Sequence, residues 1–424
     1  MGETSEPGRP GVHERRDPHV VVLADQLRRR PTSGIATYTR GLLAGLVAMG
    51  ADAPLVTLAA SKAPPGVDPL ARWGFGVRSS RLPAPVLTRM WDRGMGAGVV
   101  GRGDMQGRVA EGSVVGGTSF VEGSSLVRRG SAAGGRAAGG SAAGGSAAGR
   151  PSVLHATSLA CPYPNGVPVV CTVHDLAWRE VPDAFPGRGR RWHEAALGRC
   201  LERAAVIVAP SERTGALLRE AGAGSVVVIP EGCDHLAAAD PMQADALLRS
   251  LGVVTPYLLT VSTIEPRKNL PRLLNAYDRA RGRLPEPWPL LVVGPHGWGG
   301  SLRPTPGVKL AGVVSDAVLA ALYAGARCMA YVPLVEGWGL PPVEAMAACT
   351  PVVASPMPST AGAVIEVDPY DIDAIADALV VAAGEDRRRS ELVTAGLLRA
   401  QELTWEAAAR RHVDVWRSVH GSGG

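Results

Sequence analysis

Short apolar runs alternate with longer amphipathic stretches along most of the 424-residue chain. Each Val-, Ile- or Leu-rich run is bounded by turn residues and predicts a buried strand, and the stretches that follow the runs predict helices. The first series consists of HVVVLAD, SVLHATS, VPVVCTVHDLAW, AAVIVAPSERTGALLREAG and SVVVIPEGCDHL, in chain order. This alternation predicts a parallel sheet with helices on both faces.

A second series follows residue 250 and contains PYLLTVSTIEPRKNLPRLLNAYDRAR, PLLVVGP, VKLAGVVSDAVLAALYAGA, CMAYVPL and PVVAS. Two consecutive α/β series, in a chain too long for one ordinary core, predict two Rossmann-like domains that face each other across a cleft. We place the first domain at 18–250 and the second at 251–404, after a polar, disordered tail at 1–17.

Residues 93–150 interrupt the first series. They contain 18 of the 53 glycines and end in four near-copies of the pentapeptide GSAAG. Such a segment buries too little apolar surface to offset the entropy lost on ordering, so we expect a disordered insertion in the first domain. A packed, silk-like array is the alternative, for which four copies are few.

The composition is typical of globular domains, with 46% hydrophobic residues. No run of 18 apolar residues occurs, and the first 18 residues lack the apolar centre of a signal peptide, so we expect a cytoplasmic protein. The six cysteines are scattered singly, without C-x-x-C or zinc-type spacing. They are expected to be buried small hydrophobic residues rather than disulfide partners or metal ligands.

The net charge of +5 comes from the first domain. Residues 1–250 contain 28 Lys and Arg against 22 Asp and Glu, and residues 251–424 contain 16 against 17. A basic domain suits an anionic membrane surface, a phosphorylated acceptor or nucleic acid. The arginines are dispersed, however, so an ordinary solvated surface explains them equally well.

Ligands of open α/β sheets bind beyond the carboxyl ends of the strands, where the stretch VEGWGLPPVEAMA, at 335–347, is the most informative. Its two prolines fit the first turn of a helix, where we also place Glu344, and Glu336 lies before that helix on the loop. Gly337 and Gly339 allow the backbone to approach a ligand, and a helix start can bind an anion. The stretch therefore predicts a pocket wall with backbone donors and two carboxylates, with a simple helix cap as the alternative.

Two adjacent cations, Arg267 and Lys268, follow the first strand of the second series, just before a predicted helix. Fixed positive charge beside the N–H groups of a helix start suits a diphosphate. The chain has only three lysines among its 44 basic residues, so a lysine here indicates a need for a compact point charge. A surface pair at a helix start is the alternative.

Two weaker candidates lie in the first series. His174 and Asp175 end the apolar run of CTVHDLAW, where His174 suits a hydrogen bond to a sugar hydroxyl or proton transfer. The alternative is a satisfied core histidine, followed by an aspartate that caps the next segment. Gly34, in TSGIA, precedes a helix and by itself indicates only a tight turn.

Taken together, these loops resemble the retaining GT-B glycosyltransferases of family 4, which use nucleotide-diphosphate sugars. The stretch at 335–347 is similar to the E-x7-E motif of that family, with Glu336 and Glu344 as its glutamates. EPRKN, HDLAW, VIPEG, LAGVVSD and VDPYDIDAIADAL also resemble segments of bacterial members. The resemblance spans nearly the whole chain outside 93–150.

The resemblance implies a catalytic group and a donor site. Glu344 would hold the ribose hydroxyls of the donor, and Glu336 would contact the donor sugar and its phosphate. Arg267 and Lys268 would neutralise the diphosphate as the glycosidic bond breaks, so no metal is implied. His174 would contact the sugar. Further donor-binding positions are implied at Gly337, Gly339, Leu340, Gly34 and Val313.

The resemblance also implies a mechanism that retains the anomeric configuration and no cofactor apart from the nucleotide-sugar donor. EPRKN with EGWGLPP is most similar to mannosyltransferases of surface-polysaccharide assembly, which implies GDP-mannose as the donor. The implied acceptor is a glycan or a polyprenyl-linked sugar, with peripheral contact at the cytoplasmic face of the membrane and no nucleic acid partner. The C-terminal helix, at 405–420, would cross back onto the first domain.

Three features depart from the family pattern. Paired glycines are usual near Gly34, where this chain has Ser33 and Ala36, and glycine is usual at Cys349. The segment after SPMPST is shorter than the usual one, which carries another acidic residue. A sugar-nucleotide epimerase or a phosphorylase would share the fold without this combination of motifs. A catalytically inactive nucleotide-sugar-binding protein is the non-enzyme alternative. The intact diphosphate and ribose residues favour an active transferase.

Overall fold

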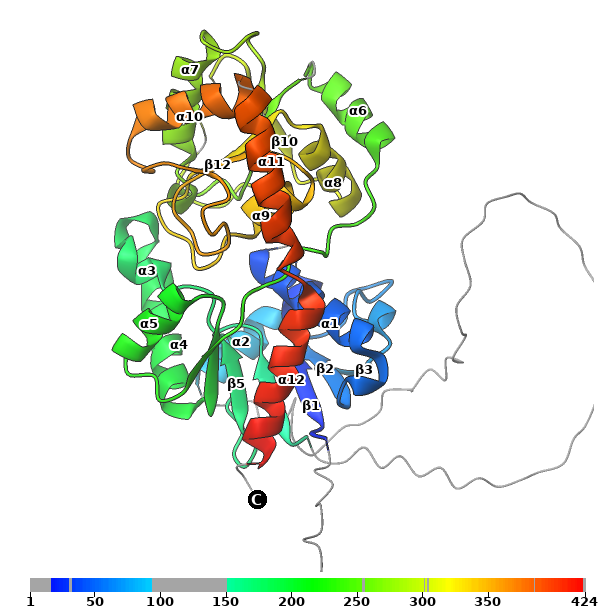
Figure 1. Cartoon of the computed structure of the whole chain (residues 1–424). Coiled ribbons are helices and arrows are strands. Elements are labelled where there is room, and N and C mark those ends of the chain that lie inside the picture. The colour runs from blue at the N-terminus through cyan, green and yellow to red at the C-terminus, as the bar shows by residue number, and fades with distance from the viewer. Residues whose placement is uncertain are drawn as a thin grey trace, which may run out of the picture.

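The computed structural model of the chain contains two parallel β-sheets, each flanked by helices (Figure 1). It describes residues 17–29, 33–93, 151–253, 256–300, 302, 305–384 and 386–421. The predicted insertion lies outside these residues except for residue 93, and the predicted tail lies outside them except for residue 17. The two predicted Rossmann-like domains are confirmed.

The first sheet has the strand order β3-β2-β1-β4-β5-β6-β7. Its strands are β1 (Val20–Leu23), β2 (Val56–Ala60), β3 (Gly76–Ser79), β4 (Val153–Ala156), β5 (Val169–Thr172), β6 (Val206–Ala209) and β7 (Val226–Val228). All neighbouring pairs are parallel. The four strands β1, β4, β5 and β6 are buried along their whole length, because helices cover both faces of the sheet.

The second sheet has the strand order β10-β9-β8-β11-β12-β13 and is also parallel. Its strands are β8 (Leu258–Val261), β9 (Leu290–Val293), β10 (Val308–Gly312), β11 (Cys328–Tyr331), β12 (Val352–Ala354) and β13 (Ile365–Glu366). The strand order reverses between β8 and β11. Loops that leave the carboxyl ends of these two neighbours therefore meet at the switch point, where such sheets bind ligands.

Helices connect the strands of each sheet. In the first domain they are α1 (Gly34–Met49), α2 (Ala84–Asp92), α3 (Ala177–Glu180), α4 (Gly187–Arg203) and α5 (Glu212–Glu220). The later helices are α6 (Pro241–Ser250), α7 (Leu270–Arg281), α8 (Asp316–Gly325), α9 (Leu340–Ala347), α10 (Ile372–Gly384), α11 (Asp386–Gln401) and α12 (Trp405–Gly421). Serine side chains cap three of them, because Ser33, Ser211 and Ser315 each accept a hydrogen bond from the N–H three residues on.

The position of α6 differs from the predicted domain division. A boundary after residue 250 would leave α6 in the first domain, but α6 packs against α8 of the second (Figure 1). The N–H of Asp240, at the cap of α6, also donates to the carbonyl oxygen of Ala317 at 3.0 Å. These contacts place α6 in the second domain, so the chain crosses between the domains before α6, in the segment after β7.

The C-terminal helix α12 lies against α1 of the first domain (Figure 1). Its first residue, Trp405, is 2% exposed and packs on three glycines. A Cβ at Gly41, Gly45 or Gly232 would lie within 2.0, 2.2 and 2.3 Å of Trp405 atoms, respectively. These positions therefore require glycine for close approach to the indole and its backbone.

Every strand named in the two predicted series is present. The sequence did not predict β2, β3 or β13, or the helices α2, α3, α4, α6, α10 and α11. β3 is a half-exposed edge strand, and β13 has only two residues, so neither has the continuous apolar run of a central strand. β2 has the apolar sequence VTLAA, so its hydrophobic pattern could have predicted a buried strand.

Candidate functional site

The predicted cation pair and the first predicted glutamate come together at the switch point of the second sheet. Arg267 and Lys268 lie in the 3-10 helix η6 (Pro266–Lys268), which follows β8, and Glu336 lies on the loop that follows β11. β8 and β11 are parallel neighbours, so the two loops leave the same edge of the sheet. The predicted helix after the cations is α7, which begins directly behind Asn269.

One carboxylate oxygen, Oε1 of Glu336, accepts three hydrogen bonds. The donors are Arg267 Nη1 at 2.7 Å, Lys268 Nζ, and the hydroxyl of Tyr331 at 3.0 Å. Lys268 also donates to the Tyr331 oxygen at 2.7 Å, and Arg267 pairs with Glu265 at 3.1 Å. Two cations therefore face two carboxylates, and charge within the cluster is balanced in this conformation.

The buried charges of the cluster shift one another's pKa values. Burial by itself raises the pKa of Glu336, but the charges of Arg267 and Lys268 outweigh burial and hold that pKa at about 2. Burial and the neighbouring Arg267 lower the pKa of Lys268, while Glu336 opposes the change. Glu336 is therefore ionised throughout the physiological pH range.

The glutamate loop leads into α9 through Gly339, whose φ of 99° is left-handed. A Cβ there would lie 2.4 Å from the Sδ of Met357, so the position requires glycine on two grounds. Leu340 is buried and is the first residue of α9, and the two prolines follow it in the predicted first turn. The prediction that Glu344 also lies in the first turn is wrong, because the helix starts at Leu340 and Glu344 is in its second turn.

The side chain of Glu344 is only 8% exposed, and both of its oxygens have partners. Oε1 lies 2.9 Å from His235 Nε2, and Oε2 accepts from the hydroxyl of Tyr323 at 2.8 Å. Burial raises the pKa of this carboxyl, but the hydrogen bonds from His235 and Tyr323 outweigh burial and lower the pKa. Glu344 is therefore a carboxylate held in a fixed orientation.

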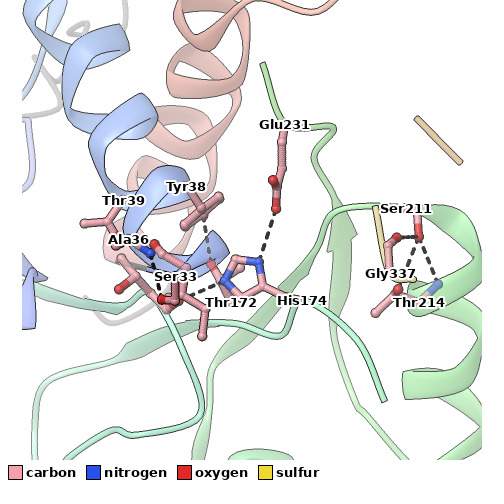
Figure 2. A network of polar contacts seen from close by, with 12 residues as sticks. Ser33, Ala36, Tyr38, Thr39, Thr172, His174, Ser211, Thr214, Glu231 and Gly337 are labelled. Carbon is pink, nitrogen blue, oxygen red and sulfur yellow. Dashed lines mark hydrogen bonds and ion pairs between the residues drawn. The ribbon is translucent and has the colours of Figure 1, made fainter. Parts of the chain in front are cut away.

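The first domain contacts the glutamate loop at Gly337. A Cβ on Gly337 would come within 1.8 Å of the carbonyl oxygen of His174, so only glycine allows this approach. The Ser211 hydroxyl, at the start of α5, donates to the carbonyl oxygen of Gly337 at 2.8 Å (Figure 2). The backbone approach that the glycine predicts is made here by the first domain.

His174 presents no free ring nitrogen in this conformation (Figure 2). Nδ1 lies 3.1 Å from a Glu231 oxygen and Nε2 lies 3.0 Å from the Thr157 carbonyl oxygen. Both partners are acceptors. Burial lowers the pKa of His174, but the hydrogen bond to Glu231 and the charge of Glu231 outweigh burial, so the pKa is raised. Asp175 accepts from the N–H of Ala177 at 3.0 Å, as a cap. In this conformation His174 is a hydrogen-bonded histidine followed by a capping aspartate, and the sugar contact assigned to it stays a prediction.

The remaining predicted donor-binding residues are exposed. Gly34 is the first residue of α1, with open space where a Cβ would lie, and Ser33 before it caps that helix. Val313 follows β10 and is 59% exposed. The roles assigned to Gly34 and Val313 stay predictions.

Three side chains of the site were not predicted, namely Tyr331, His235 and Tyr323. Tyr331 and Tyr323 lie in apolar stretches, where a buried hydroxyl needs a polar partner, and that need is a signal the sequence contains. His235 lies near the end of the segment VIPEGCDHL, after the last strand of the first series.

Within the described ranges, no group of three or more His, Cys, Asp or Glu side chains could hold a metal ion. In the same part of the chain, no helix has both the length and the apolar character needed to span a bilayer.

Two family models match the chain, "Glycosyl transferases group 1" over residues 252–395 and "Glycosyltransferase Family 4" over residues 135–235. Phosphatidyl-myo-inositol mannosyltransferase of Mycobacterium tuberculosis is 31% identical over 274 residues, which cover 60% of this chain and 69% of that protein. The chain belongs to the group 1 glycosyltransferases. This finding favours a transferase over the epimerase, phosphorylase and inactive alternatives.

A second relative and two solved structures are also similar to this glycosyltransferase. O-antigen chain mannosyltransferase B of Escherichia coli is 29% identical over 265 residues, covering 58% of this chain and 70% of that protein. The fold is similar to that of sucrose-phosphate synthase from Thermosynechococcus elongatus, with a TM-score of 0.64 and 17% identity. The match covers 95% of this chain and 99% of that chain. The fold is also similar to that of HepE from Anabaena in complex with UDP and glucose, with a TM-score of 0.61 and 15% identity. That match covers 94% of this chain and 100% of that chain. These neighbours confirm the GT-B architecture.

Cys349 differs from the expectation that all six cysteines are buried, and it stands where the family pattern has glycine. Five of the six cysteines are buried as predicted, but Cys349 is exposed. It follows α9 with a left-handed φ of 58°, a conformation that favours glycine. Glycine would adopt this conformation at the end of the helix without strain, and cysteine in its place strains the backbone.

We expect Cys349→Gly to raise the free energy of unfolding by about 1 kcal/mol, because glycine removes the left-handed strain but enlarges the entropy of the unfolded chain. Urea denaturation measures the change, and Cys349→Ser, which keeps a Cβ, is the control. A glycine variant no more stable than the serine variant would contradict this prediction.

The His174–Glu231 pair predicts a pH-dependent stability. The pKa of His174 is raised above its ordinary value of 6.5, so the stabilisation is fully present below that pH and is lost as the pH rises through the folded-state pKa. We expect the stability advantage of wild type over Glu231→Gln to shrink by about 1–2 kcal/mol between pH 6 and pH 9. Denaturation of both proteins across this range measures it. Parallel pH profiles would show that the pair does not titrate as described.

Proposed function

We propose that this glycosyltransferase moves a hexose, with mannose favoured, from a nucleotide-diphosphate sugar to a glycan or polyprenyl-linked acceptor. The anomeric configuration is retained, and no metal ion is required. The observation that supports the proposal is the cluster of Arg267, Lys268 and Glu336 at the switch point of the second sheet, beside the start of α9 and next to the first domain.

The two cations suit the electrostatic demand of the reaction. A departing nucleoside diphosphate gains negative charge as its bond to the sugar breaks, and preorganised cations stabilise that charge. Without a donor, Arg267 and Lys268 are neutralised by Glu336 and Glu265. On donor binding the diphosphate competes for both cations, and the released lone pairs of Glu336 accept hydrogen bonds from the donor sugar.

The transfer step needs no protein base under this proposal. The bond from C1 of the sugar to the diphosphate oxygen breaks, and the acceptor oxygen forms its bond to C1 on the same face. The acceptor hydroxyl proton passes to the leaving phosphate oxygen, so charge and atoms balance. The structure supports this choice because both ring nitrogens of His174 are already hydrogen-bonded within the protein. His174 then shapes the wall through its carbonyl oxygen, against Gly337.

Donor identity rests on the relatives. The curated relatives from M. tuberculosis and E. coli are named mannosyltransferases, which favours GDP-mannose for this chain. The solved Anabaena relative is in complex with UDP and glucose, so UDP-glucose is the competing donor to test. Glu344, buried beside the start of the second domain's helix α9, is the residue that we assign to the donor ribose.

A basic surface on the first domain suits a lipid-linked acceptor at an anionic membrane face. Arg188, Arg190 and Arg191, in the first turns of α4, are exposed. α2 lies beside α4, where the indole N–H of Trp192 donates to the Asp92 carboxylate at 3.0 Å. Opposite charge would hold this face against anionic lipid. Cosedimentation with anionic vesicles, and none with zwitterionic vesicles, is the expected result, and equal binding to both would argue against the proposed contact.

The proposed activity is tested first by thermal shift with a panel of nucleotide sugars and then by NMR of the product. We expect GDP-mannose to raise the unfolding midpoint most, and the product to have the anomeric configuration of the donor. An inverted product would refute the retaining mechanism, and stabilisation by UDP-sugars alone would refute the proposed donor.

A further inference from the structure

We propose that His235 and Trp405 form a positioning pair that orients the Glu344 carboxylate for donor binding and connects it to the hinge between the two domains. The inference rests on the proposed function in one respect, the assignment of the donor ribose to Glu344. Neither residue touches the reacting atoms, so each would act through Glu344.

A directed chain of hydrogen bonds joins the three residues. Trp405 Nε1 lies 3.0 Å from His235 Nδ1, and His235 Nε2 lies 2.9 Å from Glu344 Oε1. An indole N–H can only donate, so Nδ1 of His235 must accept, and the ring proton must lie on Nε2. Nε2 then donates to the carboxylate. Trp405 therefore selects the imidazole tautomer that Glu344 needs.

Glu344 is held from two sides and still has acceptor capacity. Its other oxygen, Oε2, accepts from the hydroxyl of Tyr323 at 2.8 Å. A carboxylate offers about four acceptor positions, so roughly two remain after His235 and Tyr323 are satisfied. Two acceptors on one fixed carboxylate match the vicinal hydroxyls of a ribose. A freely rotating carboxylate would lose side-chain entropy when the ribose binds. The Glu344 side chain is already fixed by its two hydrogen bonds, so binding does not incur that loss.

The same residues lie where the chain crosses between the domains twice. The N–H of Cys233, on the outgoing crossing, donates to the carbonyl oxygen of Leu403, on the returning one, at 3.0 Å. The N–H of Trp405 donates to Asp234 at 2.8 Å, and the indole and backbone of Trp405 pack on the three glycines described above. A movement of α12 relative to the second domain would therefore displace the donor to His235 and, through it, Glu344.

Trp405→Phe is the most direct test, because phenylalanine keeps an aromatic ring at this buried position and removes the indole N–H, although part of the bicyclic ring that packs on Gly41 is lost with it. Trp416 supplies a matched control: it is also buried on α12, and the described residues offer its Nε1 no hydrogen-bond partner. Titration calorimetry with GDP, or with UDP if UDP binds more tightly, should show a dissociation constant raised roughly tenfold for Trp405→Phe and unchanged for Trp416→Phe. The donor KM should rise similarly, with kcat changed less than about threefold.

A double-mutant cycle separates positioning from general destabilisation. In a Glu344→Gln background, Trp405→Phe should weaken nucleotide binding no further, because its effect passes through the carboxylate. Additive losses, or equal binding by the Trp405→Phe and Trp416→Phe proteins, would overturn the proposal. His235→Leu, which leaves the indole packing intact, should reproduce the loss, and His235→Gln, which keeps an N–H donor, should restore part of it. These two variants decide the matter if Trp405→Phe does not fold.

The cycle also separates this inference from the proposed function. If Glu344→Gln alone binds the nucleoside diphosphate as tightly as wild type, the ribose assignment fails and the positioning role fails with it. If Glu344→Gln weakens binding and the Trp405 and His235 variants do not, only the positioning role fails.

Discussion

Replacing Lys268 with alanine is expected to lower kcat by roughly two or more orders of magnitude, the scale of losing one preorganised donor from a transition state. Charge accumulates on the diphosphate only as the glycosidic bond breaks, so a cation there stabilises the transition state more than the bound donor. Burial with Tyr331 and Glu336 holds the Lys268 ammonium in place before the donor arrives. Steady-state transfer at saturating donor measures the effect.

Two variants make this result specific. Lys309→Ala removes another of the three lysines, on β10 away from the switch-point strands, and should keep the wild-type kcat. Lys268→Arg should restore only part of the rate, because a forked guanidinium does not reproduce a compact point charge in a tight site. A thermal midpoint close to that of wild type shows that Lys268→Ala is folded. A folded Lys268→Ala enzyme as fast as wild type would remove Lys268 from the mechanism.

Glu344→Gln is expected to raise the donor KM about tenfold or more and to change kcat less. The ribose contact is similar in the bound donor and in the transition state, so its loss weakens binding without slowing the bond-breaking step. Glutamine keeps the shape but puts an NH2 group where an oxygen accepts from His235 or Tyr323, which also disturbs the orientation of the side chain.

Donor titrations of the initial rate measure this change. Glu366→Gln, on the exposed edge strand β13, is the matched control and should leave the donor KM unchanged. An unchanged KM for Glu344→Gln would show that the carboxylate does not contact the donor, and a fall in kcat alone would place it in the chemical step.

The parts of the site that could be predicted from sequence follow from strand order. Arg267 and Lys268 follow one apolar run and Glu336 follows another, and in a parallel sheet both must emerge at the same edge. Gly337 and Gly339 were predicted as points of close approach because glycine alone lacks a Cβ. The structure supplies the neighbours, namely the His174 carbonyl oxygen and the sulfur of Met357.

The parts that could not be predicted depend on contacts between distant segments. The hydrogen bonds that His174 makes to Glu231 and to the Thr157 carbonyl oxygen could not be predicted, because both partners lie on other segments of the chain. Nothing local in the sequence indicates that Trp405 would reach His235. The helix starts at Leu340, directly after the left-handed Gly339 and one residue before the prolines, and this start places Glu344 in the second turn.

The rate of sugar transfer by the wild-type enzyme in the presence of EDTA tests the central claim most directly. If Arg267 and Lys268 carry the charge of the leaving diphosphate, transfer from GDP-mannose proceeds at the same rate with and without the chelator, and added Mg²⁺ changes nothing. Transfer abolished by EDTA and restored by Mg²⁺ would contradict the account, since a metal ion would then supply the charge that we assign to these two side chains.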